Sequence, residues 1–203
     1  MSFLKLFKSM TIPVTQYGGP VLRQKGDPVA DFNDELRSFA RDMIETMHEE
    51  EGIGLAAQQV SKALQLFVMD LNVETGPAPF AYTLDGKTPP LELIMPMVVI
   101  NPELEITGEE AAYDEGCLSF PGIRGDVVRR TYVKMTFQDL DGIRHELVAD
   151  GLLARCILHE YDHLQGILFI DRMTPQVLRK IETRVKQLKR NSRKRARRGT
   201  SED

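Results

Sequence analysis

The stretch His159-Glu160-Tyr161-Asp162-His163 carries two histidines four residues apart, with a glutamate directly after the first. On an α-helix, residues four apart lie about 40° from each other around the axis, so both imidazoles can reach one ion. Glu160 then points into the same space and can act as a base. The pattern predicts a helix that holds two metal ligands and a group for proton transfer. A buried helix that happens to carry two histidines is the plainer alternative.

The residues around this stretch predict where its helix begins and ends. Asp150 is a favourable N-cap, and Gly166 is a favourable stop just past the last turn. Residues 167–170 are apolar and predict a short strand. Thr174-Pro175 then predicts the start of a C-terminal helix. One apolar stripe runs along that helix, formed by Val177, Leu178, Ile181, Val185 and Leu188.

The first part of the chain predicts one helix and several strands. Residues 11–30 are rich in Gly and Pro and predict an extended segment. A helix capped by Asp31 or Asn33 should follow, because apolar residues recur at helical spacing there: Leu36, Phe39, Ala40, Met43 and Met47. Strands are predicted at residues 64–71, 97–106, 132–137 and 143–149, with an Asp141-Gly142 turn joining the last two. Residues 72–96 contain five prolines and predict a long loop.

Composition limits the classes of protein that this chain can belong to. Its 203 residues suffice for one domain with a sizeable core. Hydrophobic residues make up 42% and charged residues 28%, and no apolar run approaches the ~20 residues that span a bilayer. Apolar runs before Met10 are too short for a secretory signal. We therefore expect a cytoplasmic protein without a membrane partner, with an organellar transit peptide as the alternative.

The net charge of −4 hides a strong asymmetry along the chain. Residues 179–198 hold 11 Lys or Arg and one acidic residue, a local charge of +10, which leaves −14 for the rest. A basic terminus on an acidic body is typical of an arm that binds polyanions. A solvated charged face that aids solubility is the alternative.

A hydrolytic metal site usually has three protein ligands, so the helix needs one more. The metzincin spacing requires a histidine at position 169, where this chain has Phe169, and that class is excluded. Glu182, nineteen residues beyond His163, has the spacing of a thermolysin-like peptidase ligand.

The two cysteines are the remaining candidates for the third ligand, because a lone pair of cysteines is no disulfide framework. Cys156 shares one edge of the helix with His159, and three ligands in a line along one helix do not form a tetrahedron. Cys117 lies in a short segment between predicted strands. A ligand that arrives from a separate element suits a tetrahedral site.

Three segments together resemble the ordered signature motifs of the peptide deformylase family. They are residues 52–59 (GIGLAAQQ), 115–119 (EGCLS) and 159–163 (HEYDH), and the resemblance covers about residues 11–190. Enzymes of that family remove the formyl group from the N-terminal formylmethionine of newly made proteins. The resemblance implies an α+β fold, with short antiparallel sheets around a central metal-binding helix and a C-terminal helix. It implies a catalytic domain over residues 1–178, with residues 179–203 as a basic helix end and tail.

The resemblance also implies a role for each matched residue. Three of them would hold the metal ion: Cys117, His159 and His163. The ion would be Fe²⁺, with Zn²⁺, Ni²⁺ or Co²⁺ as substitutes. Gln59 and the backbone N–H of Leu118 would bind the formyl oxygen, while Glu160 would move protons. The matched residues on the substrate side are Ile53, Gly54, Arg124, Leu152 and Cys156.

Two residues depart from the family pattern, and two rival functions stay open. Gln58 stands where many relatives have proline, and Arg155 stands where an apolar residue is common near the substrate pocket. We expect Arg155 to change the shape and polarity of that pocket. The first rival is a thermolysin-like peptidase that uses Glu182. The second is an RNA-associated protein whose metal site is structural or inert.

The expected partners follow from the same resemblance. Nascent formylmethionyl peptides would be the substrate, and the basic C-terminal helix would dock on the ribosome by binding RNA phosphates. We expect no DNA partner.

Overall fold

The structure is a computed structural model that describes residues 10–71 and 80–199, without the side chains of residues 196–199. Residues 72–79 of the predicted long loop lie outside the described residues. The helices and strands in chain order are α1 (Asp34–Glu49), β1 (Gly54–Ala56), β2 (Leu66–Met69), β3 (Tyr82–Leu84), β4 (Met97–Gly116), β5 (Arg124–Gln138), β6 (Arg144–Asp150), α2 (Gly151–Leu164) and α3 (Pro175–Gly199). Short 3₁₀ helices lie at Pro20–Arg23, Ala57–Val60, Leu91–Leu93 and Phe169–Asp171.

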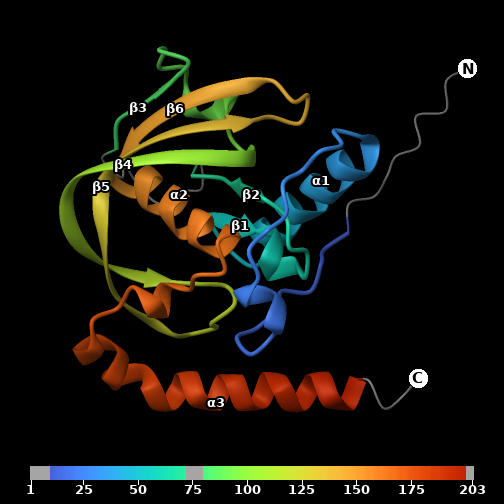
Figure 1. Ribbon diagram of the computed structural model, residues 1–203, viewed down its shortest axis with the longest axis vertical. Helices are drawn as coiled ribbons and strands as arrows, with labels where there is room; N and C mark the ends of the chain where they lie inside the picture. Colours follow the sequence, from blue (N-terminus) through green and yellow to red (C-terminus); the bar gives the residue numbers. More distant parts are fainter. Residues whose placement is uncertain (1–9, 72–79, 200–203) are drawn as a thin grey trace, which may run out of the picture.

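The strands pair in the order β1-β2-β4-β5-β6-β3, and every pair is antiparallel. Strands β4 and β5 form a long two-stranded ribbon that curves around α2 (Figure 1). Register shifts between Ile100 and Glu103 and between Thr107 and Glu110 interrupt this ribbon, and such irregularities bend a strand. The α+β class is confirmed, although the strands form one continuous sheet.

Helix α2 is the central element, with nine buried residues out of 14. Leu153 and Ile157 are fully buried in the same cluster as Val133 and Leu147 of the sheet. Removing this apolar surface from water contributes on the order of 1.5–3 kcal/mol for each fully buried side chain. The histidine motif therefore sits on a helix that the core holds in place.

Helix α1 packs against β1 and β2 through Met43 and Met47, which are fully buried. Its N-cap is Asn33, whose side-chain oxygen accepts the Leu36 N–H at 2.9 Å. The sequence had left Asp31 and Asn33 as alternatives, and only Asn33 makes the bond expected of a cap.

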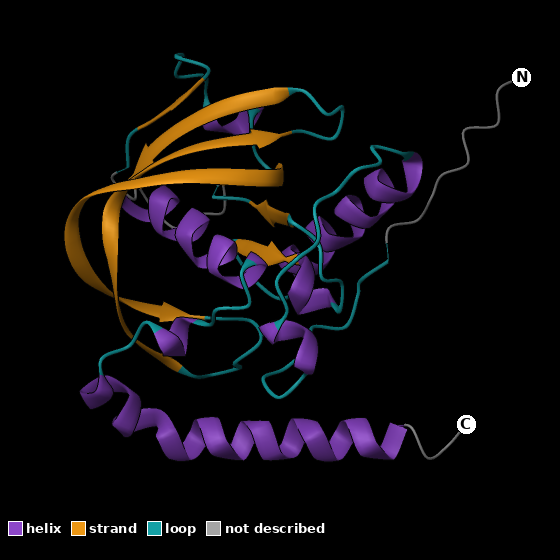
Figure 2. Ribbon diagram, in the orientation of Figure 1, coloured by secondary structure: helices purple, strands orange, loops and turns teal. Residues whose placement is uncertain are grey.

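Helix α3 forms a separate layer across one end of the molecule (Figure 2). Ile181 and Val185 of its apolar stripe are buried in a cluster with Phe120 and Phe169. The helix runs without a break across residues 178 and 179, where the basic segment was predicted to begin. The apolar residues of the same helix therefore attach the basic segment to the rest of the protein.

Two local predictions were wrong, and a third was confirmed in position only. Residues 167–170 contain the beginning of a 3₁₀ helix in place of a strand, because the Leu168 N–H bonds to the Asp171 carboxylate at 2.8 Å and turns the chain. The predicted loop 72–96 includes β3 and a 3₁₀ helix in its described part. Asp150 is the N-cap residue of α2, but its carboxylate accepts the Ala81 N–H and caps nothing.

Strands β4 and β5 are much longer than predicted. The outer part of β4 is mostly polar and exposed, and the outer part of β5 shows no apolar run because Arg129 lies on its buried face. No helix in the described ranges has the length and apolar character needed to cross a membrane.

Candidate metal centre

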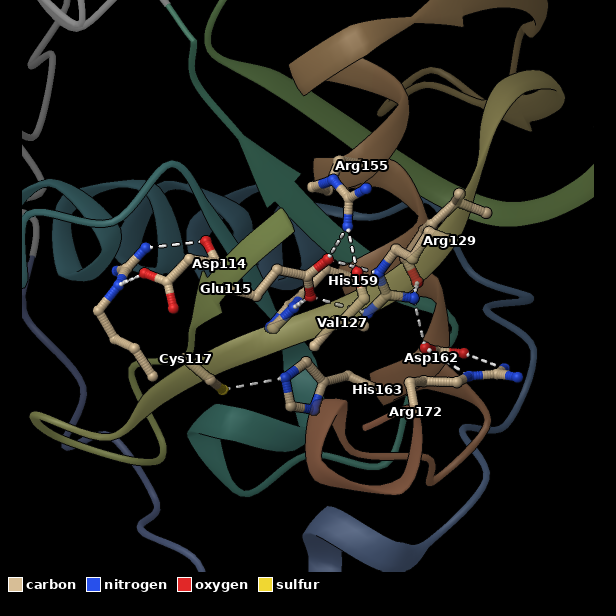
Figure 3. A network of polar contacts seen from close by, with 12 residues as sticks. Asp114, Glu115, Cys117, Val127, Arg129, Arg155, His159, Asp162, His163 and Arg172 are labelled. Carbon is tan, nitrogen blue, oxygen red and sulfur yellow. Dashed lines mark hydrogen bonds and ion pairs between the residues drawn. The ribbon is translucent and has the colours of Figure 1, made fainter. Parts of the chain in front are cut away.

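Two elements bring three possible metal ligands together. Helix α2 carries His159 and His163 on one face, and Cys117 follows directly after β4. One potential ligand atom from each of the three residues lies within 4.8 Å of the other two. Cys117 Sγ is 3.3 Å from His163 Nε2 (Figure 3). The cluster predicted from the three motifs is therefore assembled by the fold.

The orientation of each imidazole suits a metal ion. His159 Nδ1 lies 3.0 Å from the Glu115 carboxylate, which leaves Nε2 for the cluster. A carboxylate on the outer nitrogen is the usual way in which proteins fix a metal-binding histidine. His163 is almost fully buried, and its Nδ1 has no hydrogen-bond partner among the described residues. One thiol and two imidazoles form a donor set that fits several divalent transition metals.

The other two candidates for the third ligand lie elsewhere. Glu182 is exposed on α3, where its carboxylate pairs with Lys186 at 2.7 Å. Cys156 points toward the carbonyl oxygen of Ile53 at 3.5 Å, and burial raises the pKa of its thiol well above the ordinary value. A neutral buried thiol packs as a small apolar residue.

Glu160 is buried and follows the candidate ligand His159 directly on α2. Its Oε2 has no hydrogen-bond partner among the described residues, and it is an atom that water or substrate would satisfy. Burial raises the pKa of Glu160 to about 7, against the opposing effect of the His159 charge. A Cβ at position 54 would lie 2.5 Å from Glu160 Oε1. Gly54 is therefore required there because the carboxyl group occupies the space of a side chain.

Two hydrogen-bond donors lie beside the cluster. Gln59 is buried, and its Oε1 accepts the Ala56 N–H at 2.8 Å, so its amide N–H₂ is turned toward Cys117 at 3.5 Å from Sγ. The Leu118 N–H has no hydrogen-bond partner within the described part of the chain. Donors arranged in this way can stabilise an oxyanion.

The residues expected on the substrate side separate into two groups. Ile53, Leu152 and Cys156 pack in one apolar cluster, beside Gly54. Arg124 is exposed, and its guanidinium bonds to the side chain of Asp114 at 2.6 Å and to the backbone oxygen of that residue. Substrate contact by Arg124 would require that ion pair to open.

Comparison with known proteins decides the family. The model of the polypeptide deformylase family matches residues 11–179. Peptide deformylase of Opitutus terrae is 48% identical over 181 residues, which cover 88% of this chain and 93% of the relative. Among solved structures, a plant peptide deformylase is 34% identical with a TM-score of 0.78, over 91% of this chain and 92% of the other. The enzyme of Thermotoga maritima is 37% identical with a TM-score of 0.69, over 81% and 99%.

The chain belongs to the polypeptide deformylase family. The resemblance seen in the three sequence motifs is confirmed. The protein is an enzyme, a hydrolase of the family that removes formyl groups from nascent peptides, and its Cys-His-His cluster is a possible metal site.

Behind the cluster lies a buried ionic network that the sequence motifs did not indicate. Arg129 is buried and bonds to both oxygens of Glu115, at 2.7 and 3.1 Å, and to Asp162 at 2.7 Å (Figure 3). Arg129 and His159 outweigh the effect of burial and lower the pKa of Glu115 to about 2.

A sequence signal for this network did exist. Arg129 falls in phase with Val127, Val133, Met135 and Phe137, which form the buried face of β5. An arginine on the apolar face of a strand indicates a buried ion pair, because an unpaired buried charge is too costly.

Proposed function

We propose that this protein removes the formyl group from the N-terminal formylmethionine of nascent polypeptides, with a divalent ion held by Cys117, His159 and His163. The observation that carries the proposal is the convergence of these three ligand atoms within 4.8 Å of one another, with the buried Glu160 following His159 directly on α2. Thermolysin-like chemistry is disfavoured because Glu182 pairs with Lys186 on the surface. An inert metal site is disfavoured by Glu160, a buried carboxyl group whose Oε2 has no hydrogen-bond partner among the described residues.

When bound, a divalent ion lowers the pKa of water beside it and so supplies hydroxide near neutral pH. Attack on the formyl carbon places negative charge on the formyl oxygen, where the Gln59 amide and the Leu118 N–H donate hydrogen bonds. One such donor contributes about 10²–10³ in rate. Glu160 takes the proton from water and delivers it to the departing amine, since burial raises the pKa of this carboxyl group above its ordinary value. Formate and a free N-terminal methionine are the products.

The substrate side follows the family resemblance. We propose that the peptide lies along Ile53 and Gly54, with the methionine side chain against Leu152 and Cys156. Arg124 would meet the peptide after release of Asp114. We propose Fe²⁺ as the native ion, with Zn²⁺, Ni²⁺ or Co²⁺ able to replace it, and a cytoplasmic location.

The deciding experiment measures formate release from formyl-Met-Ala-Ser under anaerobic conditions with Fe²⁺ or Ni²⁺. Glu160→Gln should keep the ion and the fold but lose about 10²–10⁴ in kcat. Glu182→Ala is the matched control and should keep both ion and turnover. Absence of formate release by the loaded wild-type protein would refute the proposal, and loss of the ion in Glu182→Ala would support the peptidase.

We also propose that α3 binds ribosomal RNA phosphates. Its apolar stripe is packed against the body of the protein, with Ile181 and Val185 buried. Arg190, Arg193 and Lys194 are exposed. Side chains at residues 196–198, which include two more arginines of the basic arm, lie outside the described residues.

Replacing these three residues with Gln removes charge without touching the packed stripe. We expect weaker co-sedimentation with ribosomes and a salt slope that falls by about 1 for each lost phosphate contact. Lys25, Lys62 and Lys87 are exposed and belong to other segments than α3, and their replacement with Gln removes the same charge as a control. Equal binding by both triple variants would contradict a specific role for α3.

A further inference from the structure

Arg155 does not take the position that the sequence suggested. It lies on α2 one turn before His159, where we expected it to alter the substrate pocket. Its side chain is only 12% exposed and reaches away from the helix into the β4–β5 ribbon (Figure 3). There it donates hydrogen bonds to the Val127 carbonyl at 3.1 Å and the Ala111 carbonyl at 2.9 Å. The guanidinium also lies over the Tyr113 ring, 5.4 Å from its centroid.

The same guanidinium bonds to the carboxylate that orients a candidate metal ligand. Arg155 Nη1 is 2.7 Å from Glu115 Oε1, and Glu115 Oε2 is 3.0 Å from His159 Nδ1. Arg129 bonds to both oxygens, whereas Arg155 bonds only to Oε1. With two arginines on Oε1, the carboxylate cannot rotate without breaking a buried ion pair.

We infer that Arg155 is a positioning residue for the metal centre: it holds the Glu115 carboxylate so that His159 keeps its ligand nitrogen directed at the ion. Any effect of Arg155 on catalysis rests on the proposed function, whereas its effect on the metal ligands does not. Arg155 acts through Glu115 and does not touch the cluster itself.

The geometry of arginine is essential to this role. A single planar guanidinium joins a carboxylate on β4, a carbonyl on each strand of the ribbon, and helix α2. Lysine carries the charge on a single nitrogen, so it cannot reach both the acceptors that bond to Nη1 and the Ala111 carbonyl that bonds to Nη2. Arg155→Lys should therefore keep the buried charge and lose most of the positioning.

The test uses the full-length protein loaded with Co²⁺, whose visible absorption reports on ligand geometry. In Arg155→Leu we expect a changed Co²⁺ spectrum and release of the ion to a chelator about 10–100-fold faster than in wild type. Arg155→Lys should resemble Arg155→Leu in both readouts. Arg130→Leu is the matched control, because Arg130 is exposed on the same ribbon and bonds to the Gly108 carbonyl. It should behave as wild type.

The outcomes separate this inference from the proposed function. A wild-type spectrum and release rate in both Arg155 variants would overturn the positioning role, even if the enzyme deformylates peptides. Absence of formate release by the metal-loaded wild-type protein would refute the proposed function. A changed Co²⁺ spectrum in Arg155→Lys, which keeps the buried charge, would still support the positioning role. Equal acceleration of release in Arg130→Leu would overturn the inference, since any loss of ribbon charge would then suffice.

Discussion

Arginine gathers in two regions of this molecule under opposite conditions. Behind the metal centre, Arg129 and Arg155 have side chains that are 5% and 12% exposed, and both bond to Glu115. In residues 175–195 of α3, nine Lys or Arg accompany a single acidic residue, Glu182, and most of them face solvent. Burial requires each charge to be paired, whereas solvent allows like charges to gather. Arginine therefore holds a carboxylate in place in the first region, and in the second it contributes to a positive surface potential that attracts a polyanion.

The largest expected effect tests the buried side of this comparison. Arg129→Met removes the cation shared by Glu115 and Asp162 and leaves both carboxylates underpaired in a buried site. We expect the free energy of unfolding, measured in urea, to fall by about 3–5 kcal/mol. Arg130→Met, on the exposed face of the same strand, should change it by less than about 0.5 kcal/mol. Equal losses of unfolding free energy in Arg129→Met and Arg130→Met would show that burial of the arginine does not determine its contribution to stability.

A second change sharpens the comparison at one carboxylate. Asp162 is bound by buried Arg129 and also by Arg172, whose side chain is 46% exposed. Arg172→Ala leaves Asp162 paired, so we expect a loss of about 1 kcal/mol in the same urea measurement. A loss as large as that of Arg129→Met would mean that solvent does not weaken the outer pair.

The third prediction concerns a half-buried cluster remote from the metal centre. His145 lies between Asp85 at 2.7 Å and Asp139 at 3.2 Å, and the bond to Asp85 is the main reason that its pKa is raised. A raised pKa in the folded state stabilises the fold fully below the unfolded pKa of about 6.5, and this contribution disappears as pH rises through the folded pKa.

His145→Gln removes this titration. The free energy of unfolding should fall by less than about 1 kcal/mol below the unfolded pKa of about 6.5, and the difference from wild type should shrink as the pH rises through the raised folded pKa. Thermal or urea unfolding at the two pH values measures it. A difference that grows with pH would contradict the assigned direction.

The smallest effect is expected on α3. Glu182 and Lys186 form an exposed i,i+4 pair. Glu182→Gln should lower the free energy of unfolding by about 0.3–0.5 kcal/mol at low salt and by less at high salt. A salt-independent loss above 1 kcal/mol would indicate that Glu182 has a buried partner.

Much of the site followed from short motifs, because their chemistry depends on local spacing. The i,i+4 histidines share a helix face whatever surrounds them, and the apolar positions of α1, α2 and α3 have helical period. The outer half of β4 was missed because an exposed strand lacks the apolar alternation that marks a half-buried one. The outer half of β5 was missed because Arg129 interrupts the apolar residues of its buried face. The strand predicted at 167–170 failed because a side-chain bond from Asp171 turned the chain.

By itself the sequence determined the helix that carries His159 and His163, the candidate third ligand, the family and the basic C-terminal segment. Only the tertiary structure decided that Cys117 reaches the helix, that Glu182 does not, and that Arg155 turns toward Glu115 in place of the substrate pocket. The reason is physical. Helical neighbours are fixed by periodicity within a few residues, whereas a buried charge finds its partner from whichever strand the fold brings within hydrogen-bond distance.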